Sequence, residues 1–229
     1  MQISALLNHL LPFRRAPARA SARPPVLLVI GAHREELSFG EAVAAQLDRQ
    51  RLDLLRIPVG ISGQRPGPDA LEEYRQRHAE LYRQILEHVQ PAQRVLIDLH
   101  TGFDERLCSA DVLCGEPALL RCIEQQASQP GAPSGGGMRA VRLVASDRDA
   151  VLSPGECPRA ESWPWVSPVL PEAIWNRRRP LYVGIEVYLA SSSYALSSRG
   201  TAAEVRLAAA VIEAVSDCAL SVQRAMEPG

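Results

Sequence analysis

Two histidines and a glutamate stand where a hydrolytic metal site needs them. His33 and Glu36 form an H-x-x-E motif after the apolar run 26–30, and His100 directly follows the apolar run 95–99. Three residues is about one helical turn, so the first two side chains can face one point. Imidazole nitrogens and carboxylate oxygens are good zinc ligands, and two histidines with one glutamate leave a coordination position open. The sequence therefore predicts a zinc site at these three residues.

Each of these residues also has a purely structural interpretation. His33 could be a turn residue, Glu36 a carboxylate favoured by a helix start, and His100 a buried histidine with satisfied hydrogen bonds. Their joint placement at strand ends favours the metal role, because ligands bind beyond the carboxyl ends of strands in α/β sheets. Asp98 shares the side of its strand with His100, where it could orient a ligand imidazole or make a structural hydrogen bond.

Glu186 is the candidate catalytic base. It lies within the apolar run 181–189, where a lone carboxylate is unfavourable unless it is paired. A glutamate beside a zinc site can take the proton of an attacking water. The alternative is a buried ion pair with one of the arginines at 177–179.

Short apolar runs alternate with helical patterns along the chain, and this order indicates the elements that position the site. We expect strands over 26–30, 52–59, 95–99, 111–114, 141–145 and 181–189, and helices over 36–49, 69–89, 117–126 and 201–224. The alternation predicts a single α/β domain with a mainly parallel mixed sheet flanked by helices. This domain covers residues 25–229, after a flexible Arg/Pro/Ala-rich arm over 1–24.

Composition argues against several classes of protein. Lys+Arg 25 against Asp+Glu 26 gives a formal charge of -1, which disfavours a nucleic-acid binder. All the Lys+Arg residues are arginine, so a Schiff-base lysine and a P-loop lysine are excluded. No apolar run approaches the ~18–20 residues of a membrane span.

The cysteines and the N-terminus favour the cytoplasm. The five cysteines are scattered and contain no C-x-x-C pair, so we predict reduced core residues, not a disulfide framework or a zinc ribbon. The N-terminal apolar stretch precedes its arginines, the reverse of the order in a secretory signal.

Three motifs together resemble a known family. Residues 31–36 read G-x-H-x-x-E, residues 98–100 read D-L-H, and residues 184–187 read G-I-E-V before a closing helix. This pattern resembles the zinc carboxypeptidase superfamily, in particular the catalytic domain of its succinylglutamate desuccinylase/aspartoacylase branch. The resemblance extends over about residues 25–224.

The resemblance implies one Zn²⁺ per chain, held by His33, Glu36 and His100, with Glu186 as base and proton shuttle. It further implies an arginine that polarises the scissile carbonyl and arginines that bind substrate. Arg65 is the candidate for the first role. The candidates for the second are Arg178, chosen among Arg177, Arg178 and Arg179, and Arg75 or Arg77 on the expected helix 69–89. Tyr194, after the last strand, is a candidate to close over substrate, with a surface aromatic as the alternative.

The chain also departs from that family. Arg34-Glu35 replaces the usual Gly-Asn between the first histidine and the glutamate, and the Asn-Arg pair that grips the substrate carboxylate is absent. We expect no counterpart of the branch's C-terminal β-rich domain among these 229 residues.

We therefore expect a zinc-dependent hydrolase that cleaves a small carboxylate-bearing amide, such as an N-acyl amino acid, with a zinc-activated water as nucleophile. No nucleic-acid or membrane partner is expected, and the chain could form an oligomer. The alternatives are a metallocarboxypeptidase-like peptidase acting on short peptides and a catalytically inactive relative that binds a metabolite.

Overall fold

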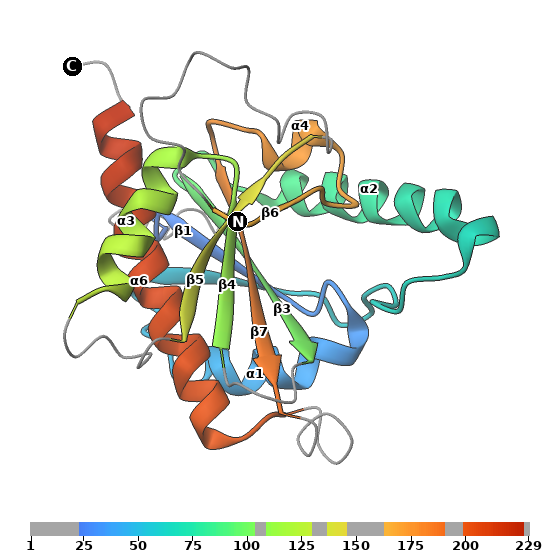
Figure 1. The fold of residues 1–229 in the computed structure, drawn as a ribbon, viewed down its shortest axis with the longest axis horizontal. Helices are drawn as coiled ribbons and strands as arrows, with labels where there is room; N and C mark the ends of the chain where they lie inside the picture. The colour runs from blue at the N-terminus through green and yellow to red at the C-terminus, as the bar shows by residue number, and fades with distance from the viewer. Residues whose placement is uncertain (1–22, 104–108, 130–136, 146–162, 191–198, 227–229) are drawn as a thin grey trace, which may run out of the picture.

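A computed structural model describes residues 23–103, 109–129, 137–145, 163–190 and 199–226. A seven-stranded sheet, in the order β2-β1-β3-β7-β4-β5-β6, forms its centre, and helices cover both faces (Figure 1). The predicted fold class, a single α/β domain with a mainly parallel mixed sheet flanked by helices, is thus confirmed.

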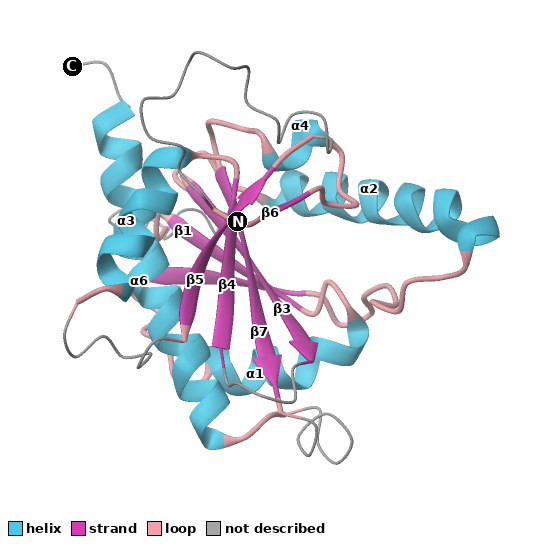
Figure 2. Cartoon of the chain, viewed as in Figure 1, coloured by secondary structure: helices cyan, strands magenta, loops and turns pink. Residues whose placement is uncertain are grey.

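The strands are mostly short and apolar, as expected for a sheet covered on both faces. They are β1 (Val26–Ile30), β2 (Leu52–Arg56), β3 (Val95–Phe103), β4 (Ser109–Cys114), β5 (Met138–Leu143), β6 (Trp165–Val166) and β7 (Leu181–Leu189). The α-helices are α1 (Leu37–Ala44), α2 (Leu71–His88), α3 (Pro117–Ala127), α4 (Glu172–Trp175) and α6 (Ala202–Met226). Two 3-10 turns, η1 (Arg34–Glu36) and η2 (Pro68–Ala70), precede α1 and α2 (Figure 2).

The sheet consists of two groups of parallel strands, and the two groups run in opposite directions. Strands β2, β1, β3 and β7 are parallel, whereas β4 pairs antiparallel with β7 and is parallel to β5. The carboxyl ends of β1, β3 and β7 therefore meet at one edge of the sheet, beside the start of β4. His100 pairs in register with Glu186, and Glu186 with Asp111 of β4.

Alternation along the strands divides the core into two layers. One set of strand residues packs with α1, α3 and α6, as Ile97, Phe39 and Ile212 illustrate. The other set packs with α2 and α4, as Leu96 and Tyr82 illustrate. Asp98 and His100 follow Leu96 at two-residue steps, so they lie on the face that α2 covers.

The expected elements differ from the observed ones mainly at their ends. The helix expected over 36–49 begins as a 3-10 turn at Arg34 and ends at Ala44, because backbone N–H groups that follow it bond to carbonyl oxygens three residues earlier and form turns. Strand β3 continues to Phe103 along the whole length of β7, so His100 lies inside the strand and not after it. Among the described helices, none has the length and apolar character needed to cross a membrane.

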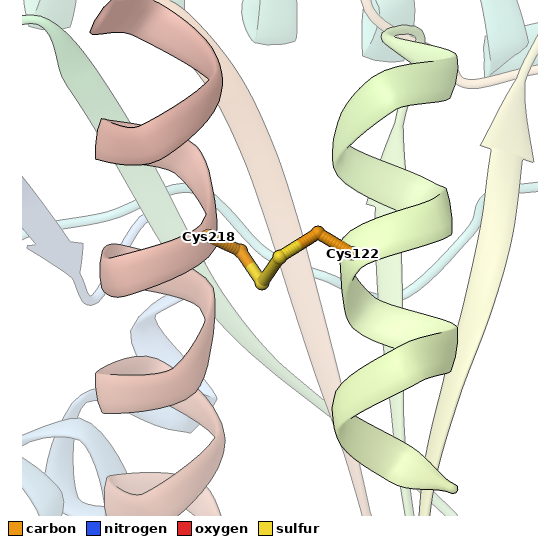
Figure 3. Close-up of a disulfide and its surroundings, with 2 residues drawn as sticks. All are labelled: Cys122 and Cys218. Carbon is orange, nitrogen blue, oxygen red and sulfur yellow. A yellow bond between two sulfur atoms is a disulfide. The ribbon is translucent and has the colours of Figure 1, made fainter.

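The expectation that the cysteines are reduced is wrong for two of them. Cys122 of α3 and Cys218 of α6 form a disulfide, although they lie 96 residues apart in the sequence (Figure 3). Sequence spacing could not reveal this pair, because only the packing of α3 against α6 brings the two cysteines together. Cys114 is reduced and buried, as expected; Cys108 and Cys157 lie outside the described residues.

Candidate metal centre

The first ligand pair is positioned by the turn that ends β1. Gly31 has a φ of 79°, and a Cβ there would lie 2.6 Å from the carbonyl oxygen of Ile57, so this turn requires glycine. His33 follows in extended conformation and forms a parallel bridge with Ile61. The 3-10 turn then returns Glu36 to the side of His33.

The carboxylate of Glu36 lies between the two histidines. Its Oε1 is 3.0 Å from Nδ1 of His33, and its Oε2 is 3.0 Å from Nδ1 of His100. One potential ligand atom from each residue lies within 4.8 Å of the others. We call His33, Glu36 and His100 the metal group. All three residues are only partly exposed. This donor set and its spacing fit a zinc ion with room for a further ligand.

His100 is supported from behind by Asp98. Its Nε2 lies 2.7 Å from Oδ2 of Asp98, which also accepts hydrogen bonds from the hydroxyls of Tyr82 and, at 3.0 Å, Tyr182. Because a carboxylate only accepts, Nε2 of His100 donates to Asp98, and Nδ1, which donates to Glu36, is the nitrogen at which a bound metal would replace the proton. The orienting role considered for Asp98 thus agrees with this geometry.

Electrostatics keep Glu36 ionised. Burial alone would raise its pKa, but His100 and His33 lower the pKa of Glu36 to about 2 through their charges and hydrogen bonds. Burial opposes a charge on His100, yet Asp98 and Glu36 raise the pKa of His100 well above its usual value. A cluster with this much negative charge around two imidazoles favours a bound cation, which would replace the protons.

A third histidine, His78, lies beside the metal group and contacts His33. His78 of α2 is buried, and its Nε2 lies 3.2 Å from Nε2 of His33, while its Nδ1 lies 2.7 Å from the carbonyl oxygen of Tyr74. Burial, the largest effect, lowers the pKa of His78.

Glu186 lies on the same face of the sheet as His100, on the neighbouring strand. Burial raises the pKa of Glu186 above its ordinary value, which is suited to accepting a proton near neutral pH. Its Oε1 lies close to Gly102, where a Cβ would be only 2.7 Å away.

The alternative of an ion pair between Glu186 and the arginines at 177–179 does not agree with their location. They precede β7, whose first residue Leu181 pairs with Val95 at the start of β3. Glu186 is five strand residues further on, about 16 Å along β7.

A cavity of about 250 Å³ opens over the metal group. His33, Glu36, His100, His78 and Glu186 line one part of it. The apolar part of the wall consists of Leu113, Leu143, Pro168, Val169 and Leu170. The cavity therefore combines ionisable side chains with an apolar surface.

The predicted site residues Arg65 and Arg75 are not among the residues that line this cavity. Arg65 is two residues from the lining residue Gly63, and its charge opposes the rise that burial causes in the pKa of Tyr74. Arg75 is exposed and forms an ion pair with Glu72 on α2. The structure does not bring Arg75 into the group.

Arg178 also lies apart from the site, because it precedes β7 at the opposite end of the sheet. Its carbonyl oxygen accepts a hydrogen bond from the Gln223 side chain, which ties this segment to α6. Tyr194 lies outside the described residues, so its role stays a prediction.

The sequence did not indicate that the aromatic residues of α2 belong to the site. Tyr74, His78 and Tyr82 recur every four residues and therefore share one face of the helix. The structure buries His78 and places it beside His33. This polar aromatic stripe within an otherwise amphipathic helix is the signal that could have found them.

Comparison with known proteins adds a likeness in fold only. Neither a comparison with protein-family models nor one with curated proteins found a match. Similar solved structures include the CwlD amidase from Clostridioides difficile in complex with the GerS lipoprotein, at 10% identity over 86% of this chain and 98% of that one, with a TM-score of 0.46.

Murine aminoacylase 3 is 14% identical over 88% of this chain and 66% of its own, with a TM-score of 0.42. A succinylglutamate desuccinalase from Vibrio parahaemolyticus is 12% identical over 87% of this chain and 67% of its own, with a TM-score of 0.37. Because these TM-scores lie below 0.5, the function is inferred below from the site itself.

Proposed function

We propose that this protein is a zinc-dependent hydrolase that cleaves the amide bond of a small N-acyl amino acid. One observation carries the proposal: His33, Glu36 and His100 converge on one point, with Glu186 on the adjacent strand of the same cavity. Ionisable side chains are costly to bury, and their concentration in this cavity favours a functional site.

The four residues divide the chemistry between them. His33, Glu36 and His100 would hold the zinc ion, which supplies a Lewis acid for the carbonyl and lowers the pKa of water. Glu186 accepts the proton of the attacking water as the water oxygen bonds to the acyl carbon. The same carboxyl group then gives the proton to the amide nitrogen as the C–N bond breaks, releasing a carboxylic acid and an amine.

The residues that line the cavity indicate which parts of a substrate would fit it. The apolar wall, which includes Leu113 and Leu170, suits a hydrocarbon portion of the acyl group or of the amino acid. Arg65, near the rim beside Gly63, is our candidate to polarise the carbonyl or bind a carboxylate, because a guanidinium does both well.

The proposal is tested with zinc-loaded wild type and the Glu186→Gln variant on a panel of N-acyl amino acids and dipeptides. We expect turnover of at least one N-acyl amino acid, and a loss of about 10²–10⁴-fold in kcat with zinc still bound in the variant. Turnover of dipeptides alone would identify a peptidase. Unchanged turnover in the variant would contradict the role of Glu186.

A further inference from the structure

The two histidines of the metal group are held in different ways. Behind His100 stands the carboxylate of Asp98, which accepts the Nε2 proton. Behind His33 stands another imidazole, that of His78, with the two Nε2 atoms 3.2 Å apart. The question is which of these two nitrogens carries the proton.

The backbone of α2 settles the tautomer of His78. Its Nδ1 lies 2.7 Å from the carbonyl oxygen of Tyr74, and a carbonyl only accepts, so Nδ1 carries the proton. A neutral His78 then has a bare Nε2, which accepts the Nε2 proton of His33. The Nδ1 of His33 faces Glu36 at 3.0 Å and is the nitrogen left to bind an ion, which would replace the proton that Nδ1 shares with this carboxylate.

We infer that His78 is a positioning residue for the metal centre. By accepting a hydrogen bond from the Nε2–H group of His33, it fixes the tautomer and ring orientation that present Nδ1 of His33 to the ion. This inference rests on the zinc site of the proposed function. His78 is suited to the task, because it is buried and its ring lies 4.0 Å from the ring of Tyr74, centroid to centroid. Hydrogen bonds of this kind tune metal affinity by about 10–100-fold.

The chain provides a matched control on the same helix. His88 of α2 also has its Nδ1 near a carbonyl oxygen four residues earlier, at 2.9 Å from Gln84, but it is exposed and lies ten residues beyond His78. A substitution of His88 thus repeats the change in helix composition and removes the same local hydrogen bond. It leaves the metal group untouched.

The test measures zinc affinity by competition with a chromophoric chelator for wild type, His78→Leu, His78→Gln and His88→Leu. We expect His78→Leu to bind zinc about 10–100-fold more weakly, His88→Leu to match the wild type, and His78→Gln to recover most of the loss, because the Gln oxygen can accept the His33 proton. Thermal unfolding of the metal-free variants checks that each is folded.

Three outcomes would overturn the inference. They are an unchanged affinity in His78→Leu, an equal loss in His88→Leu, and a His78→Gln variant as weak as His78→Leu. The absorption spectrum of the cobalt-substituted protein gives a further criterion. A positioning role predicts the same ligand-field bands in wild type and His78→Gln, whereas a change in their number or intensity would make His78 a direct ligand. If the wild type binds no zinc at all, it is the metal centre of the proposed function that fails.

Discussion

Each of the two ligand histidines turns its Nδ1 towards the carboxylate of Glu36 and has its Nε2 held by a further residue. Glu36 bridges Nδ1 of His33 and Nδ1 of His100, while Asp98 and His78 engage the opposite ring nitrogens. Glu186 takes no part in these hydrogen bonds, and burial raises the pKa of its carboxyl group. The ligands are therefore pre-arranged for a cation and the base for proton transfer.

The pH dependence of catalysis should report Glu186. Because burial raises its pKa above the ordinary glutamate value of 4.5, the ionised form that acts as base is lost as the pH falls through that raised value. We expect kcat/KM to decline on the acid side with an apparent pKa above 4.5. An acid limb at or below this value, measured on a protein that keeps its zinc, would contradict the assignment.

Space beside Glu186 depends on Gly102. A Cβ there would lie 2.7 Å from Oε1 of Glu186 and 2.8 Å from the ring of Tyr188, so Gly102→Ala must displace the catalytic carboxylate. A displacement of about 1 Å can lower turnover by about 10²-fold. The control is Gly67→Ala, since a Cβ at Gly67 meets no atom within 4 Å. Steady-state kinetics of both variants would show the difference, and equal activities would argue against this view of the site.

At the scale of elements, helix α2 supports the metal group from above the sheet. Its residues Tyr74, His78 and Tyr82 face the ligands at four-residue spacing, and Tyr82 donates to the fully buried Asp98. The other oxygen of Asp98, Oδ1, has no hydrogen-bond partner among the described residues. Asp98 therefore depends on the donors to its Oδ2.

Removal of one of those donors should destabilise the protein. A hydrogen bond to a buried charge contributes about 1.5–3 kcal/mol, so we expect Tyr82→Phe to lower the free energy of unfolding by about that amount. The matched control is Tyr74→Phe, whose hydroxyl reaches only the carbonyl of Gly63 at 3.3 Å. Denaturant unfolding of the two metal-free variants makes the comparison, and an equal, small effect in both would contradict a stabilising role for Tyr82.

The sequence predicted those parts of the fold and site that depend on local patterns. Apolar runs predicted β1, β3 and β7, and the position of His33 and His100 at the ends of such runs predicted that they would meet. The role of His78 was not predicted, because one histidine in a helix does not show which element the helix covers. Arg178 was implied by the family resemblance, as one of three arginines before the strand that holds Glu186, yet part of β7 separates the two residues in space.

At the scale of the whole molecule, the disulfide joins two helices on the face opposite α2. Cys122 and Cys218 enclose most of the second half of the chain, because 96 residues separate them. Structural disulfides persist in oxidising compartments and are rare in the cytosol. This bond therefore favours an oxidising compartment over the cytoplasm that the sequence led us to expect.

Loss of this disulfide should affect stability and spare the metal centre. We expect the Cys122→Ser/Cys218→Ser double variant to unfold with a free energy lower by about 2–5 kcal/mol, while zinc affinity stays at the wild-type value. Thiol titration of the denatured wild type should give two more thiols after reduction than before. An identical count would show that the cysteines are reduced, as first expected.

The zinc content of the purified protein is the most direct test of the proposed metal centre. Elemental analysis of the purified protein, supplied with zinc and then freed of excess metal, would be compared with that of the His33→Ala/His100→Ala double variant. We expect about one zinc per chain in the wild type and none in the folded double variant. A folded wild type that retains no zinc, or a double variant that retains as much, would contradict the metal centre and the hydrolase built on it.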